Sequence, residues 1–141
     1  MDKQVIFDFA SANPVCYLAT CDSDQPRVRG MLMWKADEKG FWFHTGSTKN
    51  MYAQMKNNPL VEVCFFNNDP DPGTSKMMRV SGKAEFVDDD ALKEQLREER
   101  PFLKAVPGGV ELIVFRITSG EAWFWTMQDN LRENEMERVK F

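Results

Sequence analysis

Residues 27–49 read RVRGMLMWKADEKGFWFHTGSTK, and this stretch decides the fold expected for the chain. Apolar and aromatic residues gather on both sides of a four-residue polar turn, which predicts a β-hairpin. If Ala36 pairs with Phe41, the hairpin has a fixed antiparallel register. In that register Arg29 lies close to Thr48.

The hairpin leads into a predicted helix over residues 50–56, and hydroxyl and ammonium groups stand at its start. A helix start offers unpaired N–H groups and a partial positive charge, both of which favour an anion. Ser47, Thr48 and Lys49 precede the helix. Arg29 adds a planar fork of donors that matches phosphate oxygens. The pattern therefore predicts a phosphate site.

A simpler interpretation of the same residues stays open. Ser47 or Thr48 would then only cap the helix, and Arg29 and Lys49 would be solvated surface charges. These residues alone do not decide between the two interpretations.

Composition restricts the class of protein. The chain has 141 residues, 43% of them hydrophobic, and a net charge of −4, which is typical of one globular domain spanning residues 1–141 and gives no support to a nucleic-acid partner. The three cysteines show no CxxC or CxxH spacing, so we expect free thiols and no metal site. We find no signal peptide and no apolar segment of membrane-spanning length, and expect a cytoplasmic protein.

The rest of the chain predicts a mainly β fold with a few helices. Strands are expected over residues 15–20, in the two arms of the hairpin, and over residues 60–66, 76–87 and 110–126. Gly82 predicts a bend or bulge in the strand over residues 76–87. Helices are expected before Asn13, over 50–56 and over 88–100, and the charged segment 127–141 is expected to be a surface tail. Six antiparallel strands joined mostly by short turns favour a β-barrel.

A barrel of this size is filled by its own side chains, so a cofactor as wide as a tricyclic ring would lie outside it or between two copies. Aromatic residues could form such a shared surface or could be plain core. The candidates are Trp34, Trp42, Trp123, Phe124 and Trp125.

A series of short motifs follows in a characteristic order. It runs through Leu18-Ala19-Thr20, the arginine-bearing strand, His44-Thr45, Ser47-Thr48-Lys49, Asn58-Pro59 and Gly82-Lys83-Ala84-Glu85. This order resembles the pyridoxamine 5'-phosphate oxidase-like family, the FMN-binding split barrels, over nearly the whole chain. The resemblance implies a six-stranded antiparallel split barrel that forms a homodimer with FMN at the subunit interface.

The resemblance also implies roles for individual residues. Arg29, Ser47, Thr48 and Lys49 would hold the FMN phosphate, and the backbone of Gly30, Met31 and Leu32 would run beside the isoalloxazine. His44 and Thr45 would reach flavin or ribityl oxygens, although an outward polar residue explains His44 equally well. Trp125 loosely matches a tryptophan that completes the site from the partner subunit.

The chain departs from the oxidase itself at several positions. Trp34 and Met77 stand where the oxidase has a lysine and a glutamine near the ring, and Thr48 stands where it has an arginine. We therefore expect a substrate other than a B6 vitamer, and assign no catalytic residue.

Three functions are compatible with this sequence. The first is an FMN-dependent oxidoreductase acting on an unidentified small molecule, because a flavin carries the redox chemistry itself. The alternative is a non-catalytic flavin- or small-ligand-binding protein of the stress or sensory kind. A third possibility is haem or a deazaflavin in place of FMN, although His44 is the only imidazole available as a haem ligand.

Overall fold

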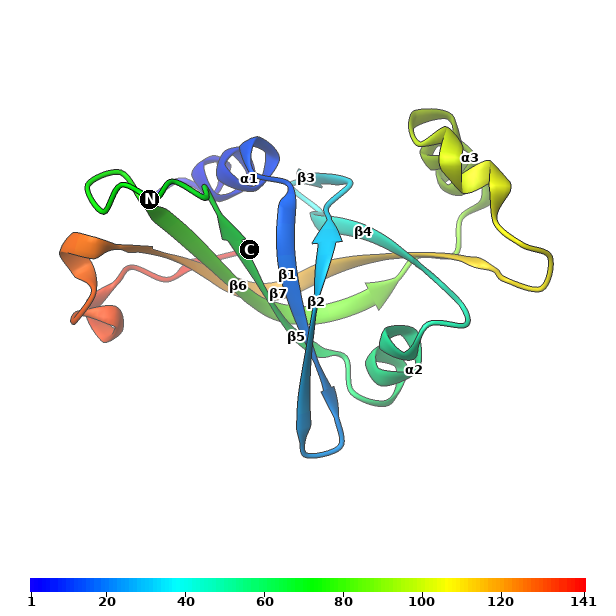
Figure 1. Cartoon of the computed structure of the whole chain (residues 1–141), viewed down its shortest axis with the longest axis horizontal. Helices are drawn as coiled ribbons and strands as arrows, with labels where there is room; N and C mark the ends of the chain where they lie inside the picture. The colour runs from blue at the N-terminus through cyan, green and yellow to red at the C-terminus, as the bar shows by residue number, and fades with distance from the viewer.

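The structure, a computed structural model, describes residues 1–141 and is dominated by one large antiparallel sheet (Figure 1). Its strands are β1 (Val15–Asp22), β2 (Gln25–Leu32), β3 (Lys35–Asp37), β4 (Gly40–Gly46), β5 (Leu60–Phe66), β6 (Lys76–Phe86), β7 (Leu112–Thr126) and β8 (Val139–Lys140). The helices are α1 (Lys3–Ala12), α2 (Asn50–Asn57) and α3 (Asp90–Glu99), with short 3-10 turns η1 (Pro101–Ala105), η2 (Met127–Asp129) and η3 (Glu133–Glu135).

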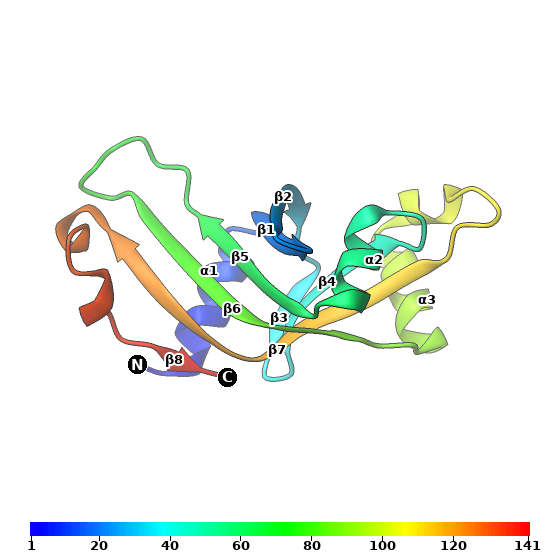
Figure 2. The ribbon, with the colours of Figure 1, turned by 90° about the horizontal axis from the view of Figure 1, so that it is seen from below.

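The sheet has the order β2-β1-β5-β6-β7-β4-β3, with β8 paired to β7. The mainly β class is confirmed, but the prediction of a closed, six-stranded barrel is wrong, because the sheet has eight strands and is open. Strands β6 and β7 run side by side along the length of the molecule (Figure 2). Helices α2 and α3 lie toward one end of it, away from both chain termini (Figures 1 and 2).

One of the two extra strands, β3, arises where the predicted hairpin breaks, and the other, β8, comes from the C-terminal segment. Ala36 does pair with Phe41, as expected, but the ladder ends at Lys35 and Trp42. Strand β2 pairs instead with β1, which places Arg29 opposite Leu18 rather than near Thr48. The hairpin arm of residues 27–35 is thus divided between the two ends of the sheet.

Hydrogen bonds at the break explain why the chain divides there. The Met33 N–H donates to Pro14 O and the Trp34 N–H to Trp42 O, so both amides are satisfied outside the β2 ladder. Met33 is buried in the main core, and the Trp34 indole packs edge-on against that of Trp42. Burial of these large side chains on separate clusters favours the break over a continuous hairpin.

The main core lies between α1 and the sheet. Phe41, Phe43, Phe65 and Phe115 are fully buried there, and α1 contributes Phe7, whose ring packs 5.5 Å from that of Phe41. A smaller cluster under α3 contains Trp42 and Leu96. Of the aromatic candidates, Trp42, Trp123 and Phe124 are therefore buried, whereas Trp34 and Trp125 are half-buried.

The C-terminal segment differs from the surface tail that we expected. Val139 is buried and pairs with Ala122 through β8. The ring of Phe141 contacts that of Phe41, with 5.1 Å between centroids. The end of the chain therefore closes one side of the core.

The long strand pair β6–β7 bends at a bulge, as Gly82 predicted. The register shifts between Ser81 and Lys83, and the backbone of Gly120 approaches so closely that a Cβ there would lie 1.8 Å from Ser81 O. The bend lets the two strands curve around the core.

None of the helices is long and apolar enough to cross a membrane.

Candidate cofactor-binding cleft

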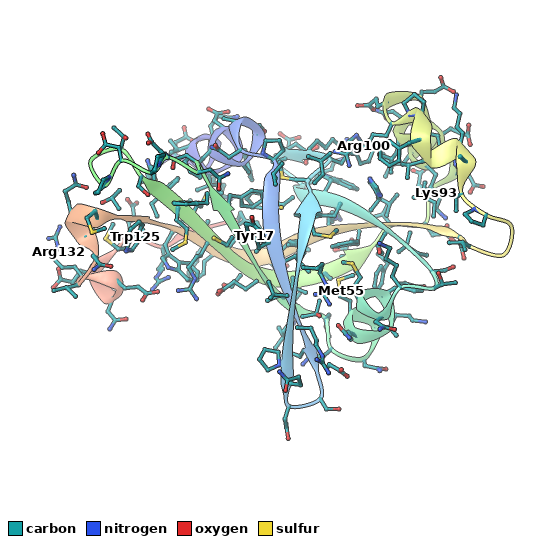
Figure 3. All side chains as sticks on the ribbon, viewed as in Figure 1. Tyr17, Met55, Lys93, Arg100, Trp125 and Arg132 are labelled. Atoms are coloured by element: carbon teal, nitrogen blue, oxygen red, sulfur yellow. The ribbon has the colours of Figure 1, made fainter.

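A cleft of about 610 Å³ opens between β2, the end of β4, the start of α2 and the segment that follows α3. Its volume falls in the range usual for small-molecule sites. Seven of the ten residues predicted to bind the cofactor line it: Arg29, Gly30, Met31, Leu32, His44, Thr45 and Lys49. Arg100, which Figure 3 labels, and Phe102 line it from the α3 side.

Arg29 is half-buried and held by neutral acceptors. Its Nη1 donates to Leu18 O and to Thr20 Oγ1, and its Nη2 donates to Gln54 Oε1 at 3.0 Å. The Thr20 hydroxyl donates to the same Gln54 oxygen at 2.6 Å, so the three side chains join α2 to the β1–β2 hairpin. Arg29 is therefore a positioned cation and not a solvated surface charge.

The start of α2 lies beside this arginine and has no side-chain cap. Lys49 is the N-cap residue and makes no capping hydrogen bond, so the interpretation that Ser47 or Thr48 caps the helix is wrong. Ser47 instead accepts from the Glu111 N–H at 2.8 Å and donates its own N–H to Glu111 O, which joins two walls of the cleft. The first N–H groups of α2 are left free of side-chain acceptors.

Arg100 crosses from the end of α3 to the break in the sheet. It donates to Leu32 O at 3.1 Å, to Met33 O at 2.7 Å and to His44 Nε2 at 2.8 Å. Because a guanidinium only donates, His44 Nε2 must accept, and the neutral imidazole carries its proton on Nδ1. Burial, followed by the positive charges of Arg100 and Lys49, lowers the pKa of His44 from 6.5 to about 4.

Two features of the cleft lining suit a bound molecule: a hydroxyl that is free to form a hydrogen bond, and open space beside a glycine. Thr45 is only 7% exposed, and its hydroxyl has no hydrogen-bond partner. A buried hydroxyl without a partner is costly, so its presence points to an acceptor or donor supplied from outside the chain. Gly30 lines the cleft, and a Cβ there would meet no atom within 4 Å, so a side chain would fill open space.

The charges around the cleft are mostly positive. None of Arg29, Lys49 and Arg100 forms a salt bridge with a carboxylate. The one acidic residue of the lining, Glu111, contacts Lys93 Nζ at 3.4 Å. The arrangement favours an anionic ligand, because no ion pair neutralises the three cations and the carboxylate of Glu99 acts on Arg100 only from beyond ion-pair distance.

Three predicted residues lie outside the cleft, and ten of its seventeen lining residues were not predicted, Arg100 and Phe102 among them. Ser47 and Thr48 flank it without lining it, and Trp125 lies toward the other end of the molecule from Arg100 (Figure 3). Trp125 lines a separate pocket, where its Nε1 donates to Asn130. Arg100 and Phe102 were missed because residues 88–100 read as a helix with a solvated face. Only the helix stop at Pro101, which lies between the two residues, marks this place in the sequence.

The family described as pyridoxamine 5'-phosphate oxidase matches residues 3–124, which is most of the chain. The chain belongs to this family. The resemblance seen in the sequence is thereby confirmed.

Individual relatives share sequence or fold with this chain, but their names differ: they include an oxidase, a NimC/NimA-family protein and a haem storage protein. A pyridoxine/pyridoxamine 5'-phosphate oxidase of Alkalilimnicola ehrlichii is 41% identical over 51 residues, which is 36% of this chain and only about a quarter (26%) of that relative. A NimC/NimA-family protein of Clostridium acetobutylicum is 27% identical over 96% of this chain and 90% of its own, with a TM-score of 0.74. The haem storage protein HutZ of Vibrio cholerae shares the fold at 15% identity and a TM-score of 0.63, covering 88% of this chain and 93% of its own.

The residues of the cleft fit the flavin cofactor that this oxidase family commonly binds. The chain offers cations for a phosphate, open space beside Gly30 and a hydroxyl on Thr45 that has no partner in the chain. The same lining includes Met31, Leu32 and Leu112, which offer apolar contact to a flat ring.

The environment of His44 gives a direct test of the cleft as described. In the wild type, His44 should stay neutral until the pH falls to about 4, and Arg100→Met should raise its pKa toward 6.5 because the neighbouring positive charge is lost. NMR titration of the imidazole reports this cleanly, since His44 is the only histidine. Lys49→Met should raise the pKa by less, because Lys49 is the smaller cause.

The pH dependence of stability follows from the same shift. The unfolded chain takes up the His44 proton near pH 6.5 and the folded chain near pH 4. The contribution of His44 to the free energy of unfolding is thus fully present above pH 6.5 and is lost as the pH falls toward 4. A wild-type His44 pKa near 6.5 that does not change in Arg100→Met would contradict the contact between Arg100 and His44.

Proposed function

We propose that this chain binds FMN in the cleft and acts as a flavin-dependent oxidoreductase on a small molecule. The single observation that carries the proposal is that positioned cations, an uncapped helix start and an unpartnered hydroxyl share one cleft in a member of this family. The phosphate is assigned to Arg29, Lys49 and the first N–H groups of α2, with Ser47 and Thr48 beside them.

The ring is assigned to the other part of the lining. The backbone of Gly30, Met31 and Leu32 offers the open side of the cleft, and Thr45 offers its hydroxyl to a flavin or ribityl oxygen. His44 is held in one tautomer by Arg100. When bound, FMN supplies the hydride and single-electron chemistry of its isoalloxazine ring, and the residues named here bind and orient it.

Flavin is favoured over haem by the state of His44. It is the only imidazole in the chain, and its Nε2 already accepts a hydrogen bond from Arg100. Ligation of haem iron through Nε2 would require that bond to break and leave Arg100 without one of its three acceptors.

A homodimer is the proposed assembly, with a second copy on the uncovered face of the sheet. A continuous row of residues crosses the side of the sheet away from the main core, from Gly30 on β2 through Tyr17 and Cys64 to Arg79. At β7 the row ends at Trp123, which is buried beneath Arg79 and Arg138, so the uncovered part of this face lies over β2, β1 and β5. Tyr17 is 49% exposed, and apolar neighbours on β1 and β2 are exposed beside it. This face is continuous with the cleft at Gly30, so a partner packed on it would border the flavin. Trp125, beside Trp123 on β7, is assigned to the partner's cleft.

The phosphate assignment is tested by removing its cations. Arg29→Met and Lys49→Met should each weaken FMN binding by roughly ten- to hundredfold, because a charge-assisted hydrogen bond contributes about 1.5–3 kcal/mol. Quenching of flavin fluorescence measures the affinity. Matched controls are Arg27→Met on the same strand and Lys56→Met on the same helix, since neither residue lines the cleft.

Unchanged FMN affinity in both Arg29→Met and Lys49→Met would contradict the phosphate assignment.

The redox behaviour of the FMN-loaded protein distinguishes an enzyme from a binding protein. Reduction of the bound flavin by NADH or NADPH, followed by transfer to an acceptor, supports the oxidoreductase. Binding without reduction supports the non-catalytic alternative.

Thr45 should show opposite effects on stability and binding. Thr45→Val replaces a buried, unpartnered hydroxyl by a methyl group of similar size, so the FMN-free protein should be as stable as the wild type or more stable. The FMN affinity should fall roughly tenfold, because the ligand loses its partner. Urea unfolding and fluorescence titration measure the two quantities, with Thr118→Val as a control outside the cleft. An unchanged FMN affinity would show that Thr45 makes no bond to the cofactor.

The dimer is tested at Tyr17. Tyr17→Glu places a charge in the middle of the uncovered face and should convert the dimer to a monomer in analytical ultracentrifugation. Lys39→Glu, in the exposed turn between β3 and β4, is the control and should remain dimeric. A wild type that sediments as a monomer at all concentrations would exclude this assembly.

A further inference from the structure

The cleft contains one more arginine than the proposed phosphate site uses. Arg29 is anchored by Leu18, Thr20 and Gln54 near the middle of β2. Arg100 is anchored at Leu32 and Met33, where β2 ends. Leu32 lies three positions after Arg29 along β2, which is roughly 10 Å of strand, so the two arginines are anchored at different parts of the cleft.

Arg100 has two unused donors on one edge. Of its five N–H groups, both on Nη1 are taken by Leu32 O and His44 Nε2, and one on Nη2 is taken by Met33 O. The Nε–H and the second Nη2–H remain. Nε and Nη2 form one edge of the planar guanidinium, and an edge of this kind matches the two oxygens of a carboxylate.

No acidic group of the chain takes this edge. Arg100 forms no salt bridge, and the carboxylate of the adjacent residue, Glu99, accepts from Trp34 Nε1 at 3.3 Å. Arg100 is half-buried, and burial lowers its pKa below the ordinary value for arginine, an effect that the charge of Glu99 offsets only in part. A cation in this position gains from an anion that enters the cleft.

An exposed aromatic ring stands next to this cation. Phe102 follows Arg100 by two residues, is 64% exposed and lines the same cleft. Its ring centroid lies 6.3 Å from that of His44. A large apolar side chain left in solvent at the mouth of a cleft offers a surface for a flat apolar group.

We propose that Arg100 binds the carboxylate of the substrate and that Phe102 packs against the substrate's planar apolar body. The substrate class is therefore a small carboxylate attached to an aromatic or other flat ring. Arg100 acts here as a specificity-determining residue, and its three present bonds keep the guanidinium fixed for a bidentate contact. This inference rests on the proposed function, because the substrate would share the cleft with FMN.

The test compares two probes that differ mainly in charge. Benzoate and benzamide have the same ring and nearly the same size, but only benzoate is an anion. Isothermal titration calorimetry at low, constant ionic strength gives their affinities for the FMN-loaded and the FMN-free protein. We expect benzoate to bind at least tenfold more tightly than benzamide to the wild type, and Arg100→Met to remove that difference.

Companion variants separate recognition from folding. Arg100→Lys keeps the charge but lacks the two-donor edge, so it should lose part of the preference for benzoate and should fold even if Arg100→Met does not. Phe102→Ala should weaken both probes equally. Lys104→Met, on the same short helix but outside the cleft, should change neither.

The outcomes distinguish this proposal from the proposed function. Equal affinities of benzoate and benzamide in the wild type would overturn the carboxylate site, as would a preference for benzoate that survives both Arg100 variants. If the wild type prefers benzoate through Arg100 but binds no FMN, the carboxylate site stands and the proposed function fails.

Discussion

The cleft depends on how the backbone is satisfied where the chain leaves β2 and enters β3. Leu32 and Met33 present carbonyl groups at the end of the strand, and both accept from the guanidinium of Arg100. Buried or half-buried carbonyl groups need such partners, and here one side chain from the end of α3 supplies two of them. Because that side chain also donates to His44, the end of β2, β4 and α3 are fixed relative to one another.

A second consequence is electrostatic. Burial of His44, together with the positive charge that Arg100 places beside it, keeps the imidazole neutral, while Arg29 is fixed at another part of the cleft by Thr20 and Gln54. Neutral acceptors position both guanidinium groups without neutralising them. The positive potential of the cleft is therefore available to a ligand. It lowers the stability of the ligand-free protein, and a bound anion would offset that loss.

The sequence predicted the local elements well and their pairing less well. Strand β5 has the limits expected, and the bulge at Gly82 and the helix after Lys49 are where the pattern places them. The hairpin of residues 27–49 was only half right, because the alternation continues through Met33 and Trp34 although these side chains enter different clusters. Local alternation carries no information on which cluster a side chain joins, so the order and number of strands could not be read from it.

The residues of the candidate site could likewise be predicted only where they lie in short, distinctive segments of the sequence. Seven of ten predicted residues share one cleft because most of them belong to two short segments whose motif order is distinctive. Arg100 and Phe102 come from a distant segment, and nothing in the sequence marks an arginine at a helix end as a partner for carbonyl groups about seventy residues earlier. Arg29 itself was predicted near the helix start through the wrong strand pairing, yet it contacts α2 through Gln54. What brings it there is the packing of α2 against the β1–β2 hairpin, a long-range contact that a hairpin register cannot reveal.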